Sequence, residues 1–181
     1  MEEDSKRYKE LCTKLPPDLR EWPAYKELKQ SISNLENLIP LIIILRKESI
    51  KDRHWEALNE KCSHNHRIPY DQMDSFTVED LIRAKVLELV DDIEEIGDSA
   101  DKQKKIESAL NEIQSYWDVR DFAFGNWGKR ENAVLSGIAV QEITEKLEED
   151  QMTLSSINAQ RHVLPFKKRV EELIRVFSET S

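Results

Sequence analysis

Glycine is scarce in this sequence of 181 residues, which holds four, at Gly97, Gly125, Gly128 and Gly137. None of them forms the G-x-G-x-x-G or G-x-x-x-x-G-K-[ST] loop, whose backbone amides close around phosphates. The sequence therefore excludes nucleotide binding in either of these two ways. So few glycines also argue against an all-β chain with many tight turns, and 39% apolar residues are too many for a disordered chain. A mainly helical fold is the leading prediction.

Cysteines and long apolar runs are also scarce. Cys12 and Cys62 are the two cysteines, and their wide separation does not fit a disulfide framework. No run approaches the roughly 18 apolar residues of a membrane span, and the charged N-terminal segment lacks the apolar centre of a signal peptide. We therefore expect a reduced, soluble and cytoplasmic protein.

Basic residues are fewer than acidic ones, with 27 Lys and Arg against 36 Asp and Glu, which gives a formal net charge of −9. This balance opposes non-specific attraction to a phosphate backbone or to an anionic membrane surface. We expect neither nucleic acid nor membrane as a partner.

Helical periodicity begins early in the chain. Apolar residues recur every three or four positions over residues 22–39, which predicts a helix. The stripe widens into an apolar run over residues 38–45, which we expect to be buried on several sides, with a kink or restart at Pro40. Ser49 is a candidate N-cap for a second helix that ends near Cys62.

The strongest periodicity covers residues 85–116. Because Gly97-Asp98-Ser99 is unfavourable in a helix, we expect a break or bend there, and Gly97 is a candidate hinge. If that position is helical, its replacement by Ala should raise helix stability by up to about 1 kcal/mol. Upstream, Thr77 and Asp80 have the spacing of a capping box and predict the start of a short helix.

The pattern changes to approximate alternation after the long helical stretch. Two short apolar runs flank a turn-like segment, which predicts a β-hairpin between Phe122 and Leu135. Helices are expected again from Gly137 and from Pro165. The predicted fold class is mainly α, with elongated helical bundles and one small β-hairpin insertion.

The domain organisation follows from these elements. We expect a peripheral N-terminal arm over residues 1–20 and a helical body over residues 21–181, with a candidate division into two sub-bundles near residues 63–76. Because the last amphipathic helix barely ends before Ser181, the chain is expected to be a fragment of a longer protein.

The sharpest candidate for chemistry is Cys62 with His64 and His66, since thiolate and imidazole groups bind zinc. Structural zinc sites usually draw two pairs of ligands from separate elements, and no second pair is present, so a solvated surface loop over residues 63–75 is favoured. Cys62 with His64 also lacks an orienting third group and oxyanion donors. The sequence predicts no catalytic, metal-binding or cofactor-binding residue.

Large apolar residues on the predicted helices and hairpin are more typical of a core than of a binding site. We expect five packing anchors, which are Trp55, Leu110, Trp117, Phe122 and Phe124.

Several segments, taken in order, are similar to a known family. These segments are the apolar run ending at Leu45, Arg53-His54-Trp55-Glu56, Phe76-Thr77-Val78-Glu79-Asp80-Leu81, Ile106 to Ile113 followed by Trp117, Val134-Leu135-Ser136-Gly137, and Pro165-Phe166. Together they resemble the linker region of dynein heavy chains, N-terminal region 2, over residues 22–177. Arg53, His54 and Trp55 are the most specific part of this resemblance and form the family motif.

The resemblance implies a non-catalytic mechanical lever that couples the ATPase cycle of a motor ring to microtubule-based movement. Its partners would be the ATPase ring of the same heavy chain and, indirectly, other dynein subunits and microtubules. ATP and Mg²⁺ would belong to that ring, and no cofactor to this chain. A cytoplasmic motor and the axonemal motor of a cilium or flagellum both fit. The alternative is a free-standing helical adaptor that binds cytoskeletal partners.

Overall fold

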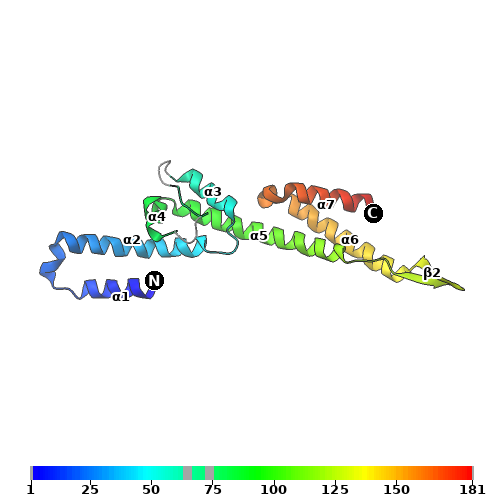
Figure 1. Ribbon diagram of the computed structural model, residues 1–181, viewed down its shortest axis with the longest axis horizontal. Coiled ribbons are helices and arrows are strands. Elements are labelled where there is room, and N and C mark those ends of the chain that lie inside the picture. Colours follow the sequence, from blue (N-terminus) through cyan, green and yellow to red (C-terminus); the bar gives the residue numbers. More distant parts are fainter. Residues whose placement is uncertain (1, 63–66, 72–75, 181) are drawn as a thin grey trace. The chain divides into compact units, whose positions relative to one another are not determined.

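The computed structural model describes residues 2–62, 67–71 and 76–180, which form two compact units, Met1–Asp101 and Lys102–Ser181. The elements in chain order (Figure 1) are α1 (Glu2–Thr13), a 3-10 turn (Pro17–Glu21), α2 (Pro23–Leu45), α3 (Asp52–Lys61), α4 (Val78–Arg83), a 3-10 turn (Val86–Glu88), α5 (Val90–Asp118), β1 (Phe124–Trp127), β2 (Arg130–Leu135), α6 (Gly137–Asn158), a 3-10 helix (Arg161–Phe166) and α7 (Lys167–Thr180). The predicted fold class, mainly α with one small hairpin, is confirmed.

The N-terminal arm folds back against α2 (Figure 1). Lys9 of α1 forms an ion pair with Glu36 of α2 at 2.7 Å. The hydroxyl of Tyr25 donates a hydrogen bond to the carbonyl of Cys12 at 3.4 Å, and the Cys12 side chain is buried. The arm is therefore held to α2 by both polar and apolar contacts.

Helix α2 continues through Pro40, so the predicted restart there is wrong. Leu38, Leu41 and Leu45 are buried, whereas Ile43 is 59% exposed. Ile42 and Ile44 are half-buried against the same core, so the run is buried over a broad face of the helix, and the expected burial on several sides fails on the side of Ile43.

The core of the first unit joins residues from both sides of the segment 63–76. Its buried members are Leu38, Leu41, Leu45, Trp55, Leu58, Cys62, Ile68, Leu81, Ala84, Val86, Ile93 and Ile96. Because Leu58 of α3 and Leu81 of α4 share this core, the division between the two units lies within α5 at Asp101 and not near residues 63–76.

Helix α5 runs without interruption through Gly97, so the predicted break is wrong. A Cβ added at Gly97 would lie 2.5 Å from Cγ2 of Ile44, far inside ordinary van der Waals contact. Gly97 therefore allows α2 and α5 to approach closely. The residue that is unfavourable for the helix is the one that packing requires at this position. A hinge at Gly97 stays a prediction.

The second unit contains the C-terminal part of α5, the hairpin, α6 and α7. Its buried core residues are Ile106, Leu110, Ile113, Leu147, Leu154, Ile157, Val163, Phe166, Val170 and Phe177. Strands β1 and β2 are antiparallel, with Phe124 opposite Leu135, and the turn between them places Gly128 at a φ of 60°. The predicted hairpin is confirmed. Glycine suits this turn because it adopts positive φ at little cost.

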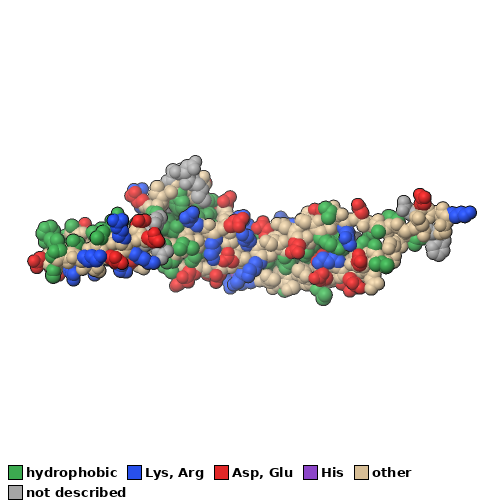
Figure 2. Space-filling model, turned by 90° about the horizontal axis from the view of Figure 1, so that it is seen from below, with side chains coloured by type: hydrophobic (Ala, Val, Ile, Leu, Met, Phe, Trp, Pro, Cys, Tyr) green, Lys and Arg blue, Asp and Glu red, His purple; other side chains and the backbone are tan. Residues whose placement is uncertain are grey.

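The surface carries both signs of charge. On the face in Figure 2, Lys and Arg side chains lie among Asp and Glu side chains, with exposed hydrophobic side chains between them. No described helix is both long enough and apolar enough to cross a membrane.

Replacing Gly97 by Ala should destabilise the protein, which reverses the expectation from helix propensity alone. Overpacking costs roughly 1–3 kcal/mol, whereas the gain in propensity is at most about 1 kcal/mol. The free energy of unfolding in urea measures the effect. Gly137→Ala is the control, because a Cβ there meets nothing within 4 Å.

Gly97→Ala should also be made in a protein that carries Ile44→Ala, because that change removes the Cγ2 atom that a Cβ at position 97 would meet. Gly97→Ala should then cost nothing or stabilise, since the two changes are coupled through one contact. Equal destabilisation in both backgrounds would contradict the close approach of α2 and α5 as the reason for glycine.

Candidate functional site

The motif Arg53, His54 and Trp55 lies in the first turn of α3. The backbone N–H of Lys51 donates to Nδ1 of His54 at 3.0 Å, and the N–H of His54 donates to the carbonyl of Lys51 at 2.8 Å. His54 is buried and satisfies a backbone donor in front of the helix. The imidazole of His54 therefore caps the N-terminus of α3. The predicted N-cap was Ser49, and this is wrong, since Lys51 is the N-cap.

Trp55 lies at the centre of an aromatic cluster. Its ring stacks on Tyr70 with centroids 6.0 Å apart and meets Phe76 edge to face at 5.9 Å. The guanidinium of Arg67 lies 5.8 Å from the centroid of the Tyr70 ring. Trp55 is only 5% exposed and belongs to the core of the first unit, as a packing anchor requires.

Asn59 of α3 holds the segment that contains Ile68. The Asn59 side-chain amide donates to the carbonyl of Ile68 at 3.2 Å, and its oxygen accepts from the N–H of Ile68 at 2.8 Å. This pair of bonds places Ile68 fully in the core. The predicted surface loop over 63–75 is therefore wrong for Ile68, and residues 63–66 and 72–75 lie outside the described residues. A single isoleucine among turn formers gave no periodic signal.

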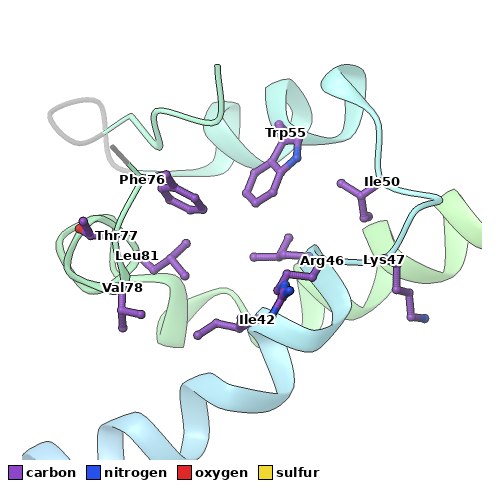
Figure 3. A pocket seen from close by; sticks show the side chains of 10 residues that line it. Ile42, Arg46, Lys47, Ile50, Trp55, Phe76, Thr77, Val78 and Leu81 are labelled. Atoms are coloured by element: carbon purple, nitrogen blue, oxygen red, sulfur yellow. The ribbon is translucent and has the colours of Figure 1, made fainter. Parts of the chain in front are cut away.

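An apolar cavity of about 430 Å³ lies beside the aromatic cluster (Figure 3). Trp55 from α3, Phe76 from the segment before α4, and Leu81 from α4 point toward it in Figure 3. Its lining residues are Ile42, Leu45, Arg46, Lys47, Ile50, Trp55, Phe76, Thr77, Val78 and Leu81. This volume is in the range of small-ligand pockets.

The lining limits what the cavity can do chemically. It contains no carboxylate, thiol or imidazole, and its charged residues are Arg46 and Lys47. Lys47 at its rim is engaged with Asp101 at 2.7 Å, and Ser49 donates to the same carboxylate at 2.6 Å. The apolar side chains of its lining suit the cavity to holding an apolar group.

The candidate metal ligands are only partly described. Cys62 is buried, and this burial raises the pKa of its thiol above the usual 9.0. The thiol is therefore protonated near neutral pH and is a poor nucleophile and ligand. His64 and His66 lie outside the described residues. Among the residues that the structure describes, no three His, Cys, Asp or Glu side chains gather as a metal site requires.

The second unit contains a polar cluster around the buried Asp150, which sequence periodicity did not predict. Nε1 of Trp117 donates to Oδ2 of Asp150 at 2.8 Å, and Nζ of Lys146 lies 2.9 Å from Oδ1 of the same carboxylate. Lys146 also pairs with Glu149 at 2.9 Å. Its hydrogen bond to Glu149, and to a smaller extent that to Asp150, raises the pKa of Lys146 above its usual 10.5.

The remaining predicted anchors have different outcomes. Leu110 is fully buried, and Trp117 is half-buried against Phe177. Phe122 and Phe124 are 62% and 55% exposed, so their prediction as packing anchors is wrong. Alternation of apolar residues indicates a strand but does not say whether a core lies beside it.

Comparisons with known proteins give one consistent family. The family model described as dynein heavy chain, N-terminal region 2, matches residues 1–181. Dynein axonemal heavy chain 8 of Homo sapiens is 30% identical over 175 residues, which cover 96% of this chain. Dynein gamma chain, flagellar outer arm, of Chlamydomonas reinhardtii is 32% identical over 171 residues, or 94% of this chain. The chain spans 4% of the length of each of these relatives.

Removing the Asp150 carboxylate should destabilise the second unit. In Asp150→Ala the Trp117 indole N–H loses its acceptor and Lys146 loses one of two carboxylates, which together should cost roughly 1–3 kcal/mol. Urea unfolding measures the loss. The control is Glu148→Ala, an exposed acid on the same helix, which should change stability by less than about 0.5 kcal/mol. Equal effects of the two substitutions would contradict the cluster's role.

The Lys146 contribution should disappear at high pH. Below pH 10.5 this lysine is charged in the folded and the unfolded chain, so its ion pairs contribute fully. Above that pH, Lys146 loses its proton in the unfolded chain first, because its pKa is higher in the folded chain. The contribution of its ion pairs to stability therefore falls as the pH rises toward the pKa of Lys146 in the folded chain. The difference in unfolding free energy between the wild type and Lys146→Met should be constant up to about pH 10 and narrow as the pH rises above about 10.5. A difference independent of pH would contradict the assignment.

Proposed function

Because this chain belongs to the dynein heavy chain family, with its N-terminal region 2 matched over residues 1–181, we propose that it is part of the linker of a dynein motor. In this role it is a mechanical element that couples the ATPase cycle of the motor ring to movement along microtubules. The single observation that carries the proposal is the family match along the whole chain.

The packing of the chain supports a mechanical role. Helix α5 has 29 residues, which corresponds to about 44 Å at the usual rise per residue. It supplies Ile93 and Ile96 to one core and Ile106 and Leu110 to the other. A continuous helix that belongs to two cores can transmit a displacement of its side chains, because packed interiors resist compression.

The chemistry of the chain supports a role without catalysis. The sequence has neither of the two phosphate-binding loops considered above, and the lining of the cavity beside Trp55 contains no carboxylate, thiol or imidazole. ATP and Mg²⁺ accordingly belong to the ring of the longer protein. The ring of the same heavy chain is the direct partner, and other dynein subunits and microtubules are reached through it.

The names of the relatives support a location in a cilium or flagellum. Two of them are called an axonemal dynein and a flagellar outer arm dynein. We therefore place this chain in the axoneme of a cilium or flagellum.

A motor whose residues 22–177 are replaced by a flexible Gly/Ser segment of equal length should hydrolyse ATP without driving microtubules. A flexible segment preserves connectivity but cannot bear a bending load. The assay measures ATP turnover and microtubule gliding on the same preparation. A motor with Glu148→Ala, an exposed substitution in the same segment, is the control and should glide normally. Normal gliding of the replaced motor would reject the lever and favour an adaptor.

A further inference from the structure

A groove between α5 and α6 in the second unit has an apolar floor and a basic rim. Its volume is about 480 Å³, and its lining residues are Lys102, Lys105, Ile106, Ala109, Met152, Thr153, Ser156, Ile157 and Gln160. Ile106 and Ile157 belong to the buried core, so the floor of the groove is the edge of that core. Met152 is 69% exposed and adds an apolar side chain to the groove next to this floor.

The charge of the groove is one-sided. Lys102 and Lys105 are three residues apart on one helix and therefore lie on the same face of α5. Both side chains are exposed, and neither ammonium group forms an ion pair or hydrogen bond within the described ranges. None of the lining residues is acidic, although acidic residues outnumber basic ones by 36 to 27 in the sequence. The groove is thus complementary to negative charge beside an apolar surface.

We propose that this groove binds an amphipathic helix of a partner protein, with aliphatic residues on one face and Asp or Glu along the flank of that face. The apolar face covers Met152 and the edges of Ile106 and Ile157, and the acidic flank pairs with Lys102 and Lys105.

A helix fits this groove better than an extended strand or a nucleic acid. Two neighbouring helices present side-chain grooves that accept a third helix through residues three and four apart. Methionine adapts its shape to different aliphatic partners, and lysine stems cover apolar surface while their ammonium groups reach a carboxylate. A nucleic acid would meet two ammonium groups but also an apolar floor and a protein of net charge −9.

The test uses the full chain of 181 residues and a fluorescein-labelled designed peptide, about 18 residues long so that it is helical. The peptide carries Leu at positions i, i+3, i+4 and i+7 and Glu on both flanks of that stripe, and a matched peptide carries Lys in place of Glu. Fluorescence anisotropy should show saturable binding of the Glu peptide that weakens with added salt, and no binding of the Lys peptide.

Substitutions in the groove separate it from the rest of the surface. Lys102→Glu with Lys105→Glu should weaken binding of the Glu peptide by about tenfold or more. The control is Lys129→Glu with Arg130→Glu at the hairpin turn, which changes the net charge equally and should leave binding unchanged. Met152→Glu, an exposed substitution, should also abolish binding, and circular dichroism confirms that each variant is folded.

Several outcomes would overturn the proposal. Equal binding of the Glu and Lys peptides would reject the charge complementarity, and equal loss in the groove and hairpin variants would reject the location. Self-association of the chain in sedimentation, lost in Lys102→Glu with Lys105→Glu, would assign the groove to a second copy instead. None of these readouts involves a motor, so failure here is distinguishable from failure of the linker assignment.

Discussion

The close approach of α2 and α5 at Gly97 is the contact on which the first unit depends. With a hydrogen in place of a Cβ, Gly97 leaves room for Ile44, and the buried stripe of α2 meets that of α5 in one core. Trp55 then packs its aromatic cluster against the same core, and His54 fixes where α3 begins. Two residues of the family motif therefore have structural roles: His54 caps the start of α3, and Trp55 anchors the helix to the core.

The second unit relies on a different kind of contact. Apolar burial is non-directional, so two helices packed by aliphatic residues alone can slide past one another. The bond from Trp117 to Asp150 is directional and links one position of α5 to one position of α6. Lys146 balances the buried carboxylate, which would otherwise carry the cost of an unpaired charge. The cluster thus specifies how these two helices pair.

The cavity beside Trp55 and the groove along Lys102 and Lys105 both combine apolar side chains with basic ones. In the cavity, Lys47 is paired with Asp101, and the aromatic rings of Trp55 and Phe76 suit it to a small apolar group. Neither lining contains a carboxylate, thiol or imidazole. Both fit a protein that holds, or is held by, other proteins, which agrees with the linker role proposed for it.

Local sequence patterns predicted the helical segments, the hairpin and the capping box of Thr77 and Asp80, because these depend on residues a few positions apart. Tertiary packing explains why glycine occupies position 97, since the reason is a methyl group of Ile44 more than fifty residues away. It likewise decided the burial of Ile68 and Asp150. Periodicity reports which side chains share a face, but burial depends on what another part of the chain places against that face.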